Sequence, residues 1–341
     1  RVVVLEGETA TGYHASGRSV AIAHYGLGVP VVRTLTALSL PGLARHGTRH
    51  PALHIAKAGQ DAALDALEDT HRQFGCDYAR IGGEAARALL PVLKPEACEA
   101  ALVDHGALKL DTDAMLQSHV AELRAAGGTL VTGARVVALT RAGAGWQVST
   151  TAGDFAAPLL VNAAGAWADA LAHMAGVTPI GIEPRRRTVI SFAAPEGEDV
   201  RSWPFTKTVG EGFYLLPEGR GQILASSMDQ TPTDPCDAAA EELDIAIAAD
   251  RVEQATNLAI RRISHSWAGL RSFAPDELPV IGHAAEAEGF FWCAGQGGAG
   301  FQTAPALSRI AAAAVLGLPF PEDCAAAGLS AEQFSPARLG A

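Results

Sequence analysis

The sequence predicts an α/β fold with two discontinuous domains, and three observations support this class. The chain opens on residues 2–5 (VVVL), an apolar run with no polar break, which is typical of a strand buried on both faces of a parallel sheet. Residues 186–227 show longer strands separated by Gly and Pro, which indicates an antiparallel sheet. The chain closes on a Gly-rich strand-to-helix return, GQGGAGFQ at residues 295–302. This order predicts a nucleotide-binding domain built from both ends of the chain, with a second domain inserted between them.

The expected domain boundaries follow these changes of pattern. Residues 1–40, 110–180 and 275–341 form the nucleotide-binding domain, and residues 41–109 and 181–274 form the substrate domain. With 341 residues, of which 48% are hydrophobic, the chain can bury one large core or two ordinary ones.

The first half of the chain is expected to be mainly helical after the opening strand. A helix is predicted over residues 31–47, interrupted near Pro41, and a mixed helical region follows as far as residue 93. Residues 111–126 predict a further helix, because Met115, Leu116 and Val120 recur at helical spacing. Gly127 ends that helix, as a C-terminal glycine commonly does.

The second half alternates strands with helices. Strands are predicted at residues 129–139, 146–151, 159–164, 263–273 and 290–294. The third of these, LLVNAAGAW, is a buried strand that runs into Gly165 and a helix. A charged helix over residues 238–260 covers the antiparallel sheet, and an Ala-rich helix follows the final glycines to about residue 316.

Composition excludes several functional classes. The formal net charge is −11 and the sequence pI is about 5.4, so a nucleic-acid backbone is an unsuitable partner. The five cysteines are odd in number and form no C-x-x-C pair, so we expect neither a metal site nor a disulfide framework. The longest apolar run, near residues 310–318, is far shorter than the ~20 residues that cross a bilayer. We expect a cytoplasmic protein without a transmembrane segment.

The opening strand ends in an acid, Glu6. In dinucleotide-binding folds, an acid at the end of the second strand accepts hydrogen bonds from the adenosine ribose. The first strand and the G-x-G-x-x-G turn that normally precede such an acid are not in the sequence. We expect a missing segment of about 25 residues, which is the length of a strand, a turn and a helix. The alternative, an inactive fragment without its phosphate loop, stays open.

Four segments in order resemble the D-amino-acid oxidase superfamily of FAD-dependent oxidoreductases. They are LEGETATGYHASGRS (5–19), VNAAGAWAD (161–169), GFYLLP (212–217), and WAGLRSFAPDELPVIG with GQGGAGFQT (267–282 and 295–303). Bacterial D-arginine dehydrogenases share the GYH-x-x-GRS, VNAAGAW, WAGLRSF and EGFFW patterns. The resemblance covers nearly the whole chain. It implies a Rossmann-like FAD-binding domain with an inserted antiparallel-sheet substrate domain, as in D-amino-acid oxidase and glycine oxidase.

The resemblance also implies which residues contact FAD. They are Glu6, Gly17, Arg18, Ser19, Val136, Gly165, Gly297, Gly298, Gly300, Phe301 and Gln302. The glycines among residues 295–300 leave N–H groups free at a helix start, which suits the electron-rich pyrimidine end of a flavin. Taken alone, these glycines are equally consistent with a helix that needs a flexible start.

We expect FAD to bind without a covalent link. His14 in YHASG resembles the histidine that anchors flavin in dimethylglycine dehydrogenases. D-arginine dehydrogenases carry a histidine at the matching place and form no such bond. The cysteine that tethers flavin in monomeric sarcosine oxidases corresponds here to Gly269.

Arg271 is the first candidate for substrate binding. It lies in a mainly apolar strand, WAGLRSF, where an unpaired guanidinium is costly to bury, and its planar fork suits a carboxylate. The resemblance implies that it holds the substrate carboxylate with Tyr214. An arginine paired to Asp276 or Glu277 at the surface is the alternative.

The resemblance gives two further residues a place in the catalytic site. Arg187 corresponds to an active-site arginine of D-arginine dehydrogenases, and only part of the run 185–187 can face the site because a strand alternates direction. Gly298 offers its carbonyl to the substrate amine.

The loop AIAHYGLG (21–28) departs from the D-arginine pattern. It covers the substrate in the relatives, but their histidine and tyrosine positions are occupied here by Ile22 and Leu27. His24 is a candidate polar partner, and an exposed loop histidine is the alternative. The acid that binds a guanidinium is also absent, since residues 50–54 read HPALH. We therefore expect a less cationic, even apolar, substrate side chain.

These features predict FAD-dependent oxidation of a small amino acid, of D configuration, to an imine and then a keto acid. The resemblance places the substrate Cα–H against flavin N5 for hydride transfer, and oxygen or a quinone-type acceptor takes the electrons. Three alternatives stay open: a glycine- or sarcosine-type amine oxidase, a 2-hydroxy-acid dehydrogenase of the L-2-hydroxyglutarate type, and the inactive fragment. A hydroxy acid needs a catalytic base where an amine does not.

Overall fold

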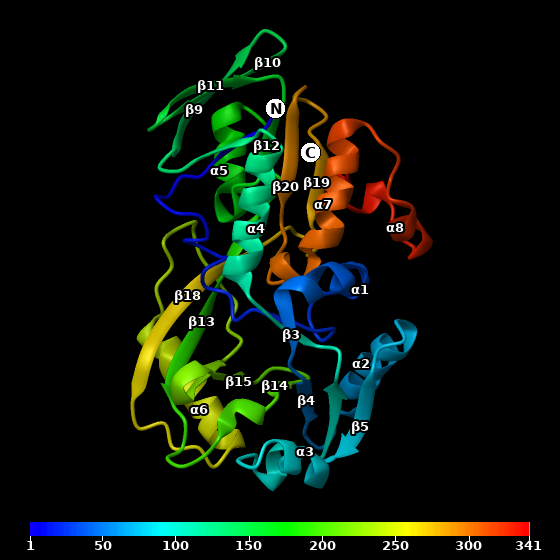
Figure 1. Ribbon diagram of the computed structural model, residues 1–341, viewed down its shortest axis with the longest axis vertical. Helices are drawn as coiled ribbons and strands as arrows, with labels where there is room; N and C mark the ends of the chain where they lie inside the picture. The colour runs from blue at the N-terminus through cyan, green and yellow to red at the C-terminus, as the bar shows by residue number, and fades with distance from the viewer. Residues whose placement is uncertain (341) are drawn as a thin grey trace.

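The computed structural model describes residues 1–340, without the side chain of residue 220, and has an α/β architecture (Figure 1). A nine-stranded sheet occupies the lower half of the view in Figure 1. Its strands, in spatial order, are β17 (Thr231–Pro232), β13 (Glu183–Ala193), β16 (Gln222–Ser226), β15 (Tyr214–Glu218), β14 (Phe205–Thr208), β4 (Ala52–Ala56), β6 (Ala100–Asp104) and β5 (Tyr78–Gly82), with β18 (Ile263–Phe273) paired to β13. Neighbouring strands are antiparallel except for β14 and β4.

The two faces of this sheet differ in chemistry because side chains alternate along each strand. One face buries residues such as Ile55, Ile190 and Leu215 against α3 (Gly83–Leu89) and α6 (Glu242–Ala255). The opposite face carries Val189, Phe205 and Tyr214, the last of which is fully buried. This second face looks toward the upper half of the molecule.

The upper half in Figure 1 holds smaller sheets and several helices. The small sheets are β1 (Val3–Leu5) with β8 (Thr129–Val131); β12 (Leu160–Asn162), β20 (Phe290–Ala294) and β19 (Val280–His283); and β11 (Gly153–Ala157), β10 (Gly145–Thr150) and β9 (Val136–Ala142). A further sheet of β2 (Ile22–Ala23), β7 (Leu108–Leu110) and β3 (Gly47–Arg49) lies between the halves. The remaining helices are α1 (Pro30–Leu43), α2 (Asp61–Gln73), α4 (Thr112–Ala125), α5 (Ala168–Ala175), α7 (Gly300–Leu316) and α8 (Glu322–Ala326).

Several predicted elements agree closely with the structure. The strands predicted at 263–273 and 290–294 match β18 and β20, and the Ala-rich helix ends at Leu316 as expected. The helix predicted over 111–126 is α4, with Asp111 as its N-cap. In each case the hydrophobic pattern and a glycine or cap residue point to the same boundary.

Three predictions between residues 31 and 139 need correction. The region from 47 to 93 is not mainly helical, because it contains β3, β4 and β5 beside α2 and α3. Strand β4 is fully buried, so its sequence (ALHIA) lacks the alternation that marks a half-buried strand. Helix α1 runs through Pro41 without interruption. Residues 129–139 form two strands, β8 and β9, rather than one.

The opening strand is not buried, which contradicts the prediction for residues 2–5. Val2, Val3 and Val4 are 58%, 42% and 41% exposed. The physical reason is that β1 pairs with β8 alone within the described chain, so one edge and its side chains are uncovered. The helix predicted over 238–260 is also shorter, since α6 covers Glu242–Ala255.

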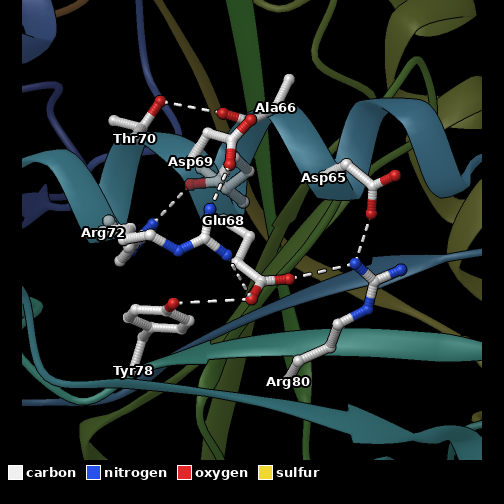
Figure 2. A network of polar contacts seen from close by, with 10 residues as sticks. Asp65, Ala66, Glu68, Asp69, Thr70, Arg72, Tyr78 and Arg80 are labelled. Carbon is white, nitrogen blue, oxygen red and sulfur yellow. Dashed lines mark hydrogen bonds and ion pairs between the residues drawn. The ribbon is translucent and has the colours of Figure 1, made fainter.

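A polar network fixes α2 against β5 (Figure 2). Glu68 lies at its centre and accepts hydrogen bonds from Arg72 and Arg80, each at 3.1 Å. Asp65 and Asp69 bind the same two arginines. On the inner side of α2, His71 Nε2 lies 3.2 Å from Asp104 Oδ2 of β6, and both side chains are fully buried.

None of the helices described in residues 1–340 combines the length and the apolar character that crossing a bilayer requires.

Replacing the N-cap of α4, Asp111→Ala, is expected to lower the free energy of unfolding by about 1 kcal/mol. The Asp111 carboxylate accepts a hydrogen bond from Ala114 N at 2.9 Å, and alanine leaves that N–H without a partner. Urea unfolding followed by circular dichroism measures the change. Asp113→Ala is the matched control, because Asp113 lies two residues further along, in the first turn of the helix, and is not the N-cap. Equal effects of the two substitutions would contradict the capping role.

Candidate active site

A cavity of about 430 Å³ brings together residues from several distant parts of the chain. The antiparallel sheet forms one wall, the loop after β1 forms a second, and the start of α7 forms a third. The predicted site residues that line it are Arg18, Ser19, His24, Gly165, Arg187, Tyr214, Arg271, Gly297, Gly298, Gly300, Phe301 and Gln302.

Strand register explains why the polar side chains of the sheet converge on this cavity. Arg187 on β13 lies opposite Gly269 on β18, and Arg271 is two residues further along β18, so both arginines share a face. Tyr214 on β15 lies opposite Lys207 on β14, and both point to that same face. Gly269 leaves room beside them for Arg18, whose Cβ would lie 3.2 Å from any Cβ at position 269.

Arg271 has no ion pair or side-chain hydrogen bond with the residues that the structure describes. Its alternative partners are occupied elsewhere: Asp276 accepts from Arg338 Nε at 2.7 Å, and Glu277 accepts from Arg185 Nη1 at 2.9 Å. Desolvation, followed by repulsion from Arg187, lowers the pKa of Arg271 to about 9. The guanidinium is therefore held beside the cavity without a compensating charge.

The glycine loop before α7 lies directly against Arg271. A Cβ built on Gly298 would be 2.8 Å from Arg271 Cζ, so a side chain at this position would displace the guanidinium. Gly297 N donates to Ser272 O at 2.8 Å and ties the loop to the end of β18. Gly297 has a φ of +55°, which favours glycine there.

The run 185–187 divides between both faces of β13, as alternation predicts. Arg187 lines the cavity and donates from Nε to Asp229 O at 2.6 Å. Arg186 points toward α6 and pairs with Asp244 at 2.9 Å. Arg185 binds Glu183 and Glu277 outside the cavity.

Lys207 is a cavity residue that the sequence analysis missed. Its ammonium has one polar contact in the described chain, a long one of 3.5 Å to Gly26 O. Desolvation, together with Arg187, Arg271 and Arg33, lowers its pKa to about 8. The signal that could have found it is the lone charged residue of the segment WPFTKT (203–208), two residues after Phe205 and so on the same face of the strand.

His24 is buried in the cavity wall and is not an exposed loop residue. Burial and the nearby Lys207 hold its pKa well below the usual range, so the ring is neutral at pH 7. Gly26 N donates to His24 Nδ1 at 3.0 Å, which leaves the ring proton on Nε2. Gln302 holds this loop in place through the backbone of His24 and through Thr36 Oγ1 at 2.8 Å.

Three of the residues predicted to contact FAD do not line this cavity. The Glu6 carboxylate accepts from Glu8 N at 2.9 Å, Gly17 N donates to Gly12 O at 2.6 Å, and Val136 begins β9. The roles of Glu6 and Val136 at the adenosine end of the cofactor, and of Gly17 at its phosphates or flavin side, stay predictions. His14 also lies outside the cavity lining, where it contacts Glu8 at 3.1 Å and packs on Trp167.

Residues 1–314 match the family described as FAD dependent oxidoreductase (DAO). The chain belongs to the FAD-dependent oxidoreductase family. Its expected cofactor, FAD, and its expected fold class are confirmed by this match and by the structural comparisons.

Curated relatives of this FAD-dependent oxidoreductase are 24–30% identical to it over the aligned residues. The chain is 24% identical to the uncharacterized oxidoreductase YurR of Bacillus subtilis, over 71% of this chain and 63% of that protein. It is 30% identical to glycine oxidase of Pseudomonas putida, over 48% of this chain and 43% of the relative. The matched region therefore spans less than two thirds of these relatives.

Solved structures show the same fold. L-proline dehydrogenase from P. horikoshii superimposes with a TM-score of 0.83 at 19% identity, covering 100% of this chain and 97% of that one. Glycine oxidase from Geobacillus kaustophilus gives 0.82 at 20% identity, covering 97% and 92%.

The cavity fits the flavin part of FAD. Glycines at positions 165, 269, 297, 298 and 300 line it, so the backbone is bare along much of its wall. The N–H groups of Gly300, Phe301 and Gln302 at the start of α7 have no acceptor within the described chain. No side chain caps this helix end, and its dipole favours an electron-rich group.

Gly298→Ala is expected to weaken binding of a simple carboxylate such as propionate roughly 10–100-fold, because the new methyl group displaces the Arg271 guanidinium. The fold should persist, since the clash is with the end of a flexible side chain and Gly298 has no positive φ. Titration calorimetry measures the affinity. Gly82→Ala, where a Cβ meets nothing within 4 Å, is the matched control. Unchanged affinity in Gly298→Ala would show that Arg271 is not held by this glycine.

Affinity for a carboxylate is expected to fall about tenfold between pH 7 and pH 10. Lys207 and Arg271 have pKa values near 8 and 9, so the free protein loses cationic charge across this range. They face Arg187, Arg33, His24, Tyr214 and Asp229 on the surrounding elements. A bound anion raises both pKa values, so binding takes up protons. Calorimetry in two buffers of different ionisation heat measures this uptake, and pH-independent affinity would contradict the lowered pKa values.

Proposed function

We propose that the protein catalyses FAD-dependent oxidation of a small α-amino acid, of D configuration, to the imine, which water hydrolyses to the keto acid and ammonia. The observation that carries this proposal is Arg271, a cation without a partner in the described chain, held against Gly298 at the glycine loop. An amino-acid carboxylate supplies the missing partner, and the position beside the loop brings the substrate next to the flavin.

Four cavity residues have a stated part in this proposal. The Arg271 guanidinium grips the carboxylate with two parallel hydrogen bonds, and the Tyr214 hydroxyl donates a third. Arg187 lines the same cavity as Tyr214 and adds positive charge. The Gly298 carbonyl accepts a hydrogen bond from the substrate amine. These contacts fix the carboxylate and the amine, and so fix the direction of the Cα–H bond.

FAD, when bound, would supply the redox chemistry as the acceptor of a hydride from Cα. The protein must let the amine lose one proton, so that the nitrogen lone pair forms the new C=N bond. No carboxylate lines the cavity within the described residues, so we propose that the substrate binds as the neutral amine. Oxygen or a quinone-type acceptor completes the electron balance.

Two observations bear on the rival reactions. A hydroxy acid needs a base for its O–H proton, and the neutral His24 ring carries its own proton on Nε2, which makes that nitrogen a donor. The amine reaction is therefore favoured. Similarity to glycine oxidase supports an amine oxidase of glycine or sarcosine as the second candidate.

The two-domain division belongs to the same proposal. All nine strands of the large sheet come from residues 52–104 and 183–273, inside the proposed substrate segments 41–109 and 181–274. The loop after β1, Gly165 and the start of α7 come from the proposed FAD-binding segments. The cavity thus lies where the two proposed domains meet.

The deciding experiment is an anaerobic visible spectrum of the flavin-loaded protein before and after addition of single D-amino acids, L-amino acids, sarcosine and 2-hydroxy acids. Bleaching by D-amino acids supports the proposal. Bleaching by glycine and sarcosine alone, or by hydroxy acids alone, would replace it with the corresponding rival. A protein that takes up no FAD would support the inactive fragment.

Arg271→Met is expected to lower kcat/KM for the amino acid roughly 10²–10³-fold, since two charge-assisted hydrogen bonds to the carboxylate are lost. The flavin spectrum should stay unchanged. Arg185→Met is the matched control, because Arg185 is the cross-strand neighbour of Arg271 but pairs with Glu183 and Glu277 outside the cavity. Stopped-flow flavin reduction measures both variants, and equal losses would remove Arg271 from the carboxylate clamp.

A further inference from the structure

We propose that the substrate carries a second carboxylate, bound by Lys207, so that the enzyme acts on an acidic α-amino acid of the aspartate or glutamate class. This inference rests on the proposed function, because it takes Arg271 as the partner of the α-carboxylate. It differs from the sequence-based expectation of an apolar side chain.

The charges that line the cavity are the first argument. The arginine and lysine side chains that line it are Arg18, Arg187, Lys207 and Arg271. No Asp or Glu is part of the lining over the described chain. Arg18 is compensated by Asp237, which it binds directly outside the cavity. Arg187 is partly compensated by Asp229, whose Oδ1 lies 4.0 Å from its Nε. Two cations, Arg271 and Lys207, remain without a carboxylate partner in the described chain.

The position of Lys207 is the second argument. A further cavity of about 500 Å³ adjoins the first, and both are lined by Leu27, Arg187, Lys207, Arg271 and residues 296–298. Lys207 therefore stands at the junction, on the strand next to Tyr214. A side chain that leaves the Cα of a substrate held by Arg271 and Tyr214 has this junction within reach of the long, flexible lysine stem.

The acids of the second cavity do not compensate Lys207. Glu277 pairs with Arg185, and Asp229 accepts two hydrogen bonds from Thr188 N at 3.0 and 2.9 Å. Glu211, the third acid, is exposed. None of them lies within ion-pair distance of the Lys207 ammonium, whose single polar contact is Gly26 O at 3.5 Å.

Desolvation gives the third argument. A buried ammonium without a partner is unfavourable, as the lowered pKa of Lys207 shows. A substrate with a neutral or apolar side chain leaves the desolvation cost of Lys207 in place. A substrate with a cationic side chain adds repulsion from Lys207, Arg187 and Arg271. A carboxylate removes the cost, since it accepts charge-assisted hydrogen bonds from Nζ. The amino acid with an acidic side chain is thus the ligand that the charge pattern selects.

The experiment uses the flavin-loaded enzyme and matched pairs of nearly equal shape, D-glutamate with D-glutamine and D-aspartate with D-asparagine. We expect kcat/KM to be at least tenfold higher for the acid of at least one pair. Lys207→Met should reduce that ratio to near one, because the larger loss of kcat/KM falls on the acids. Lys109→Met, which removes an ammonium paired with Glu218 outside the cavity, should leave the ratio unchanged.

Two outcomes would overturn the inference while the proposed function stands. One is wild-type enzyme that oxidises the amides, or apolar amino acids, as well as the acids. The other is a Lys207→Met variant that loses rate equally on acids and amides and shows a shifted flavin potential, which would make Lys207 a partner of the cofactor.

A binding measurement separates this inference from the proposed function. Glutarate and its monoamide, glutaramate, are titrated into the wild type and Lys207→Met by calorimetry. A preference for glutarate that depends on Lys207 supports the second carboxylate site even if no amino acid reduces the flavin, which would defeat only the proposed function. Equal affinity for both ligands in the wild type would overturn the inference by itself.

Discussion

The hydrogen bond from Gly297 N to Ser272 O is the contact on which the site depends. It joins the end of β18, a strand of the large sheet, to the glycine loop that opens α7. Because of this junction, Arg271 packs against the bare backbone of Gly298. The same junction brings the N–H groups of the α7 start to the cavity wall. A single backbone contact thus aligns the group that grips a carboxylate with the groups that suit a flavin.

The large sheet supports this arrangement by separating its two faces. One face is dry, with Ile190, Leu215 and their neighbours buried fully against α3 and α6. That burial stabilises the sheet by ~25 cal/mol for each Å² of apolar surface. The opposite face carries Arg187, Lys207 and Arg271, whose lowered pKa values show that holding these cations out of water is unfavourable. The apolar cluster that packs against α3 and α6 lies on one face of the sheet, and the charged side chains of the candidate site lie on the other.

Three histidines, His24, His54 and His71, lie next to one another beside the cavity. His24 in the wall packs on His54 of β4, with ring centroids 5.2 Å apart, and His54 lies near His71 of α2. The buried carboxylate of Asp104 stands behind His71. Burial lowers the pKa values of His24 and His54, so these two rings are neutral and add donors and acceptors without adding charge beside Lys207.

Much of the site was predictable, but its charge was not. The resemblance of WAGLRSF and GFYLLP to a known family pointed to Arg271 and Tyr214, and the mainly apolar strand around Arg271 pointed to it as well. Lys207 was missed because a lone lysine in a strand normally reaches solvent, and nothing in FTKT shows which end of the sheet lies under a cavity. The strands β4 and β5 were missed because buried or short segments lack a clear period.

The sequence by itself determined the family, the cofactor, the α/β class and the long amphipathic or glycine-bounded elements, because these depend on local patterns. Only the tertiary structure decided which charges are compensated. Asp276 and Glu277 lie near Arg271 in the chain, yet they bind Arg338 and Arg185, and the partners of Arg18 and Arg187 come from more than 40 residues away. The free charge on Arg271 and Lys207 is a property of the folded arrangement, since pairing depends on distance in space and not on separation along the chain.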